Sequence, residues 1–144
     1  MRYLLAALAF ALIVLADSAS VAAGSSITGF QTPSRNIVCG AFVFSSQPAT
    51  LRCDISSGLK PKPARPKNCH FDYGGTLKLG ATGRTTIGCI SDAVLPNPAK
   101  APVLAFGKTI KAGPFKCTSA KAGLTCKNRS GHGFFLARGR WSTF

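Results

Sequence analysis

Short stretches of alternating apolar and polar residues run along most of the chain. The clearest case is 37–55, where two alternating runs, each with one cysteine, flank a polar turn at Phe44–Pro48. A period of two is typical of half-buried β-strands, and turn residues between two such runs predict a hairpin. The register that gathers the apolar residues on one face pairs Ile37 with Ile55, Cys39 with Cys53, Ala41 with Leu51 and Val43 with Ala49.

Two more hairpins follow the same pattern. In 74–90, Leu77 would face Ile87 across a turn that contains two glycines. Near the C-terminus, Cys117 would face Cys126 around the turn Ala120–Gly123, and Ser119 would face Leu124 there. Glycine at the end of this turn suits a positive φ.

The remaining segments complete an all-β pattern. Strands are expected at 27–34, 103–106, 109–111 and 133–137, and proline-rich loops at 56–68 and 92–102. The chain after residue 23 shows no sustained period of 3.6, which is the signal of an amphipathic α-helix. Eight or nine short strands with Gly/Pro turns predict a small disulfide-stapled antiparallel sandwich or partly open barrel.

Residues 1–23 have the pattern of a secretory signal peptide. Arg2 supplies a positive charge, 3–16 is an apolar run, and 21–23 fits a small-residue cleavage site. The run is shorter than the roughly 20 residues of a membrane span, although an uncleaved anchor remains the alternative. We expect cleavage near Ala23, which leaves 24–144 as a single secreted or periplasmic domain without a transmembrane segment.

Six cysteines lie after the predicted cleavage site, and an even number in a small exported chain indicates a disulfide framework. They are Cys39, Cys53, Cys69, Cys89, Cys117 and Cys126. The two hairpin registers predict the pairs Cys39–Cys53 and Cys117–Cys126. The remaining pair, Cys69–Cys89, follows by elimination. Metal sites use spacings such as C-x2-C, which do not occur here, so neither a metal nor a cofactor is expected.

The chain is strongly basic, with a formal net charge of +14 and no glutamate. The proline-rich stretch 60–67 carries Lys60, Lys62, Arg65 and Lys67. These four side chains are a hypothetical binding site for anionic envelope polymer or lipid headgroups. No aromatic residue is interleaved to stack on bases, so specific nucleic-acid recognition is not expected. The alternative is a solvated loop whose charge serves only solubility.

Catalytic candidates are few. The only acids after residue 23 are Asp54, Asp72 and Asp92, each beside a cysteine or turn, where Asp commonly accepts backbone N–H bonds. His132 lies two residues after Ser130, and a nucleophile–base pair needs such groups within about 3 Å. The leading hypothesis is therefore a non-catalytic binding or envelope-associated module. The alternative is a small secreted hydrolase that uses His132 with a nearby hydroxyl such as that of Ser130.

Cysteine-anchored motifs run along nearly the whole mature chain. They are Thr32-Pro33-Ser34-x-Asn36-Ile37-x-Cys39, Leu51-Arg52-Cys53-Asp54-Ile55, Cys69-x-x-Asp72-x-Gly74, Cys89-x-x-Asp92, Phe115-x-Cys117-Thr118-Ser119, Gly123-Leu124-Thr125-Cys126-x-Asn128 and Gly131-His132-Gly133-Phe134-x-Leu136-x-Arg138. In this order they resemble a family of small uncharacterised secreted bacterial proteins with six cysteines. The chain departs from the family pattern at Arg35, Tyr73 and Ala105-Phe106, where Gly, Trp and Pro-Tyr are usual. The resemblance implies export and a disulfide-clipped domain, and it implies no activity.

Overall fold

Ten β-strands and one short 3₁₀ helix make up the regular structure of residues 24–144, which are the residues that the computed structural model describes. The predicted signal peptide at 1–23 lies outside the described residues. The elements are β1 (Ser26–Gln31), β2 (Ile37–Phe44), β3 (Gln47–Ile55), β4 (Tyr73–Gly80), β5 (Thr86–Cys89), η1 (Pro98–Lys100), β6 (Thr109–Ala112), β7 (Phe115–Ala120), β8 (Gly123–Lys127), β9 (Gly133–Ala137) and β10 (Arg140–Thr143). In this part of the chain no helix is long and apolar enough to cross a membrane.

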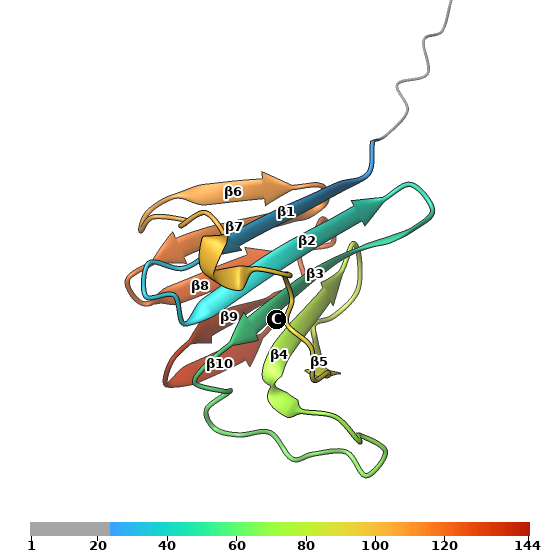
Figure 1. Cartoon of the computed structure of the whole chain (residues 1–144), viewed down its shortest axis with the longest axis vertical. Helices are drawn as coiled ribbons and strands as arrows, with labels where there is room; N and C mark the ends of the chain where they lie inside the picture. The colour runs from blue at the N-terminus through green and yellow to red at the C-terminus, as the bar shows by residue number, and fades with distance from the viewer. Residues whose placement is uncertain (1–23) are drawn as a thin grey trace, which may run out of the picture.

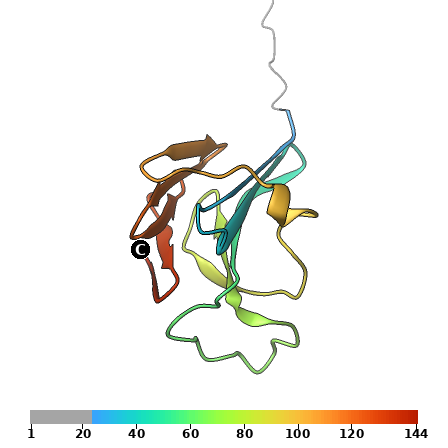
Figure 2. The same ribbon diagram turned by 60° about the vertical axis from the view of Figure 1, so that its left-hand side comes forward.

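The strands form two five-stranded antiparallel sheets that pack face to face (Figures 1 and 2). One sheet has the order β1-β2-β3-β4-β5 and the other has the order β10-β9-β8-β7-β6. Every strand therefore pairs with its neighbour in sequence, and the chain passes once from sheet to sheet, through the segment 90–108. This open sandwich confirms the predicted all-β fold class.

The core lies between the two sheets. Because side chains alternate along a strand, residues two positions apart share the inner face. The large apolar side chains with almost no exposure are Leu51, Leu77, Leu79, Leu124, Phe134 and Leu136. The disulfides Cys39–Cys53 and Cys117–Cys126 belong to the same buried cluster, so both hairpin disulfides add to the core as well as linking strands.

The segment between the sheets covers the outer face of the first sheet. Val94, Leu95 and Ala101 form a second apolar cluster there, against Val38 and Phe42 of β2. In Figure 1 this segment, which contains η1, crosses in front of β1 and β2. The first sheet is therefore covered on both faces near β2, which explains why its strands contain few charged residues there.

The three predicted disulfide pairs are all present, and most of the predicted register is confirmed. In the first hairpin Ile37 pairs with Ile55, Cys39 with Cys53 and Ala41 with Leu51. The other predicted pairs, Leu77–Ile87, Cys117–Cys126 and Ser119–Leu124, also occur. Cys69 is joined to Cys89 across the loop that precedes β4.

The predicted pairing of Val43 with Ala49 is wrong. The first hairpin turns at Ser45-Ser46, with Phe44 paired to Gln47, and the register shifts before Phe42 pairs with Thr50. Strand β3 has one more residue than β2 between these two pairs, which makes a β-bulge. Pro48 lies in the bulged segment, and proline cannot donate a hydrogen bond to the ladder.

Two strand assignments also differ from the sequence prediction. The expected strand 103–106 is reduced to a single parallel bridge between Gln31 and Val103. Pro102 precedes this bridge and a turn at Phe106-Gly107 follows it, which leaves no room for a ladder. Strand β10 was not predicted; it pairs with β9 after a two-residue turn at Arg138-Gly139.

Candidate binding surfaces

The basic loop, defined as residues 60–67, belongs to the connection between β3 and β4. Leu59 anchors its start, since its side chain is buried in the main core and its N–H donates to the carbonyl of Gly74. The indole Nε1 of Trp141 in β10 donates to the carbonyl of Pro61 at 3.0 Å. Beyond the other end, Cys69 is tied to Cys89. The loop is irregular but attached to the fold on both sides.

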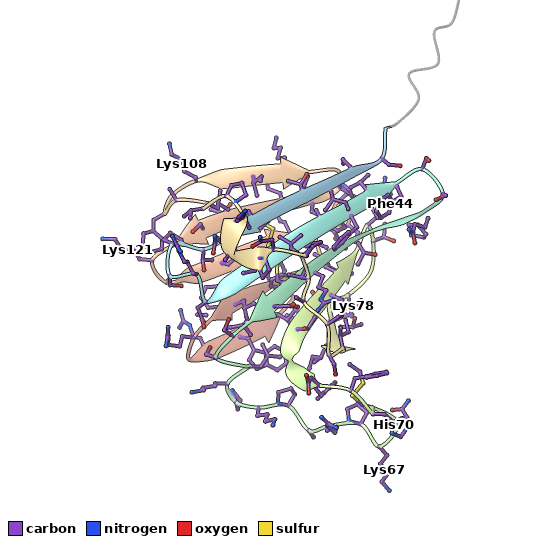
Figure 3. The ribbon with its side chains drawn as sticks, in the orientation of Figure 1. Phe44, Lys67, His70, Lys78, Lys108 and Lys121 are labelled. Atoms are coloured by element: carbon purple, nitrogen blue, oxygen red, sulfur yellow. A yellow bond between two sulfur atoms is a disulfide. The ribbon has the colours of Figure 1, made fainter. Side chains whose placement is uncertain are left out.

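All four cationic side chains of the basic loop are exposed, and within residues 24–144 none of them forms an ion pair. The guanidinium of Arg65 makes only a long contact, 3.5 Å, with the carbonyl of Cys69. Figure 3 shows Lys67 and the neighbouring His70 at the tip of the loop, away from both sheets. A groove of about 450 Å³ runs beside the loop, and its lining includes Lys60, Lys62 and Asp72.

Two of the three acids serve the structure of the first sheet. Arg52 binds Asp54 through Nε at 2.9 Å and Asp92 through Nη1 at 3.0 Å. Asp54 also accepts hydrogen bonds from the hydroxyl of Thr76 and the N–H of Val94. Burial opposes the charge of Arg52, but hydrogen bonds and charge from both aspartates outweigh it and raise the pKa of the guanidinium. This cluster holds the segment after β5 against β3 and β4.

His132 and Ser130, the catalytic candidates, are organised by Asn128. The buried Asn128 accepts bonds at Oδ1 from the hydroxyl and N–H of Ser130 and from the N–H of His132. Its Nδ2 donates to the carbonyls of Gly80 and Gly83. The Nδ1 of His132 lies 3.3 Å from the carbonyl of Phe144. In the described part of the chain no hydrogen bond joins Ser130 to His132.

The sequence reasoning did not identify Asn128. The position of Asn128 could have identified it. The residue is polar, directly follows a predicted strand and precedes Ser130-Gly131 by two positions, and Asn in such a place commonly bonds to nearby backbone. Within residues 24–144 no group of three or more His, Cys, Asp or Glu side chains is arranged to bind a metal ion. All six cysteines are held in disulfides.

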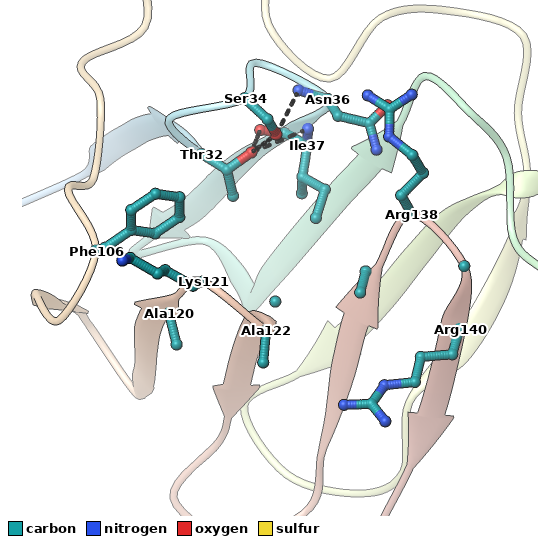
Figure 4. Close-up of a pocket in the computed structure, with 13 residues that line it drawn as sticks. Thr32, Ser34, Asn36, Ile37, Phe106, Ala120, Lys121, Ala122, Arg138 and Arg140 are labelled. Carbon is teal, nitrogen blue, oxygen red and sulfur yellow. Dashed lines mark hydrogen bonds between the residues drawn. The ribbon is translucent and has the colours of Figure 1, made fainter.

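A larger cavity, here called the end cleft, opens at the end of the sandwich where three turns meet (Figure 4). Its volume is about 550 Å³. The β1–β2 turn contributes Thr32 and Asn36, and the β7–β8 turn contributes Lys121. The β9–β10 turn contributes Arg138, and the start of β10 contributes Arg140. Phe106 completes the rim, and none of the described residues that line the end cleft is acidic.

Hydrogen bonds and packing hold the walls of the end cleft. The turn that presents Phe106 is fixed to β7, because Gly107 donates to the carbonyl of Ser119 at 2.7 Å. The side chain of Asn36 donates to the hydroxyl of Ser57 and accepts from its N–H, both at 3.1 Å. Arg140 lies over the ring of Phe135, 4.9 Å from its centre.

The end cleft is the main feature that the sequence reasoning missed. Its basic residues come from turns that are separated along the chain, and each turn alone resembles an ordinary surface turn. The predicted basic loop contributes nothing to the end cleft, since the two cavities share no lining residue. The structure therefore has two separate cationic surfaces.

Comparison with known proteins gives a family but no relative of known activity. No curated protein and no solved structure matched the chain. The model of a family of unknown function (DUF6636) matches residues 9–144, which is nearly the whole chain. The chain therefore belongs to this family of unknown function, DUF6636.

Proposed function

We propose that this protein is an exported, non-catalytic binding module that contacts anionic polymer or lipid headgroups of the cell envelope through the basic loop. One observation carries the proposal: four exposed cationic side chains, which have no acidic partner among residues 24–144, stand on a backbone that is fixed at both ends. Three disulfides are compatible with a place outside the cytoplasm. Cleavage near Ala23 and release to the periplasm or medium belong to the same proposal.

The four charges are close enough to act together. Successive basic residues are two or three positions apart, and an extended chain spans at most about 3.6 Å per residue, so neighbours are within about 11 Å along the backbone. This is comparable to the Debye length of about 8 Å at physiological salt. Because Leu59, Pro61 and Cys69 already restrain the loop, a ligand has less conformational freedom to remove on binding.

The alternative, a small hydrolase that uses His132 with a nearby hydroxyl, has less support. The hydroxyl of Ser130 bonds to Asn128, and the ring of His132 faces the carbonyl of Phe144. A general base would need to accept the proton of the nucleophile and to be oriented by a third group. Asp54, which could otherwise orient it, is bound to Arg52 and Thr76 in the other sheet.

Substitution of the loop charges tests the proposal. In the test variant Lys60, Lys62, Arg65 and Lys67 are all replaced by Ser. In the matched control Lys108, Lys111, Lys116 and Lys127 are replaced by Ser. These lysines are also exposed and lie on or beside β6, β7 and β8. Both variants lose four positive charges, so a difference between them reports position and not net charge.

Binding to single-stranded DNA of fixed length, used only as a polyanion, provides the quantitative measurement. Each neutralised phosphate contributes about 0.7 to the slope of log affinity against log salt, so the test variant should have a slope flatter by up to about 3. The control variant should keep more of the slope. Vesicles with phosphatidylglycerol, compared with heparin, then distinguish lipid headgroups from polymer. Equal affinities and salt slopes for both variants would remove the basis of the proposal.

A further inference from the structure

We propose that the end cleft is a second binding site, separate from the basic loop, and that its ligand is an acidic oligosaccharide with carboxylates spaced along its chain. The two cavities share no lining residue, so this site does not depend on the function proposed for the loop. The volume of about 550 Å³ falls in the range of about 300–1,000 Å³ that is usual for small-molecule sites.

The charge of the end cleft selects an anion. Lys121, Arg138 and Arg140 line it, and none of the three forms an ion pair within the described residues. Within residues 24–144 no carboxylate lines the cleft to offset them. Planar guanidinium groups bind carboxylates through two parallel hydrogen bonds, which gives direction as well as strength.

The placement of these cations favours several spaced charges over one compact anion. Figure 4 shows Arg138 extending toward Asn36, Arg140 extending away from Arg138, and Lys121 reaching toward Phe106. Three cations that converge on one point would suit a single phosphate. Three cations that stand around a rim suit a chain that carries one negative charge per residue.

The other lining residues suit a sugar ring. Phe106 is 48 % exposed, and the turn at Gly107 fixes it at the rim, so the face of its ring can cover the apolar face of a pyranose. Ser34 is exposed and brings a hydroxyl group to the same cleft, where it can both donate and accept. The buried hydroxyl of Thr32 lies 3.3 Å from that of Ser34 and bonds to the backbone of Ile37, so it helps to hold the turn. A sugar presents this combination of C–H face and hydroxyl edge.

Several walls of the site are held in place by contacts within the protein. Arg140 is held over Phe135, and Asn36 is held by Ser57. Gly123 allows Phe135 to pack closely, since a Cβ at that position would lie 2.6 Å from the ring. A preformed site loses less entropy on binding, which raises the affinity for a ligand of matching shape.

A nucleic acid is the less favoured occupant. Among the described residues that line the cleft only Phe106 is aromatic, whereas single-stranded nucleic acids are usually held by several stacking platforms. The three disulfides are compatible with an extracytoplasmic location, where acidic polysaccharides are the more accessible polyanions.

Calorimetric titration with tetragalacturonate tests the inference. The full mature chain should bind this probe at least about tenfold more tightly than neutral maltotetraose, as expected for charge-assisted hydrogen bonds. A variant with Lys121→Gln, Arg138→Gln and Arg140→Gln should bind it at least about tenfold more weakly. Phe106→Ala should weaken binding about threefold to tenfold, and should do so equally at high and low salt because the ring is uncharged.

Two controls separate the cleft from general charge. A variant with Lys111→Gln, Lys116→Gln and Lys127→Gln loses the same charge on another surface and should bind within about twofold of the unmodified chain. The variant that lacks the four loop charges should also bind tetragalacturonate within about twofold of the unmodified chain. The test of the cleft is therefore independent of the test of the basic loop. Thermal melting confirms that each variant is folded.

The inference is overturned by any of three results. The first is failure of the unmodified chain to bind tetragalacturonate. The second is unchanged affinity in the Lys121, Arg138 and Arg140 variant. The third is tighter binding of tripolyphosphate or oligothymidylate than of tetragalacturonate, which would assign the cleft to a compact phosphate or to nucleic acid.

Discussion

The disulfide Cys69–Cys89 has a stabilising effect that can be worked out from the structure. The bond closes a loop with a sequence separation of 20 residues. In the chain-entropy model such a loop contributes about 3.3 kcal/mol to the free energy of unfolding at 25 °C. Replacing both cysteines by Ser should lower the stability by about this amount, because Cys89 is only partly buried and a hydroxyl there remains near water. Cys69 is buried, but its Sγ lies 3.4 Å from the carbonyl of Phe71, which a serine hydroxyl can use as a hydrogen-bond acceptor.

The comparison with Cys117–Cys126 makes this prediction sharper. Its separation is 9 residues, which corresponds to about 2.7 kcal/mol in the same model. Both of its cysteines are buried in the core, so two Ser residues would also bury two hydroxyl groups at about 1–3 kcal/mol each where partners are lacking. The cost of burying two hydroxyl groups therefore outweighs the difference in loop-closure free energy. Loss of Cys117–Cys126 should destabilise the protein more than loss of Cys69–Cys89.

Urea unfolding under non-reducing conditions measures both effects. The Cys69→Ser, Cys89→Ser variant should also bind single-stranded DNA more weakly at low salt, since one end of the basic loop is then released. The reasoning is refuted if this variant loses less than about 1 kcal/mol, which is far below the value from loop closure. It is also refuted if the Cys117→Ser, Cys126→Ser variant proves the more stable of the two.

Two further predictions concern single residues. His132→Ala should leave the protein folded and polyanion binding nearly unchanged in thermal melting and titration, because within residues 24–144 the one hydrogen bond of its ring is to the carbonyl of Phe144. A hundredfold loss of any hydrolytic activity would instead favour the enzyme hypothesis. Gly123→Ala should destabilise by about 1–3 kcal/mol in urea unfolding, because its φ is +153° and a Cβ would lie 2.8 Å from the carbonyl oxygen of Leu136. Unchanged stability would show that β8 and β9 can separate there without cost.

Local patterns predicted the hairpins well because three independent signals agreed there. Around Cys39 and Cys53 the alternation, the turn residues and the possible disulfide all required one register, and that register is present. The error at Val43 arose where only alternation was used, and the bulge at Pro48 shifted the pairing. Strand β10 was missed because its single apolar residue, Trp141, gives no alternation to detect.

The two binding surfaces differ in how far sequence could predict them. The basic loop is contiguous, so its charges were visible as a run, although its attachment through Trp141 was not. The end cleft depends on which turns meet at one end of the sandwich. That arrangement follows from packing of one sheet on the other, and nothing in the residues around Lys121 or Arg138 specifies it locally.

None of the three disulfides joins one sheet to the other. Each bond links two cysteines that follow one another along the chain, and each bond stays within one half of the sandwich. In the export from the N-terminus that we propose, the second cysteine of each pair is therefore the next cysteine to emerge after the first. Oxidation can keep pace with translocation, and we expect little need for disulfide isomerisation. The two meanders can mature one after the other, and only their final docking waits for the whole chain.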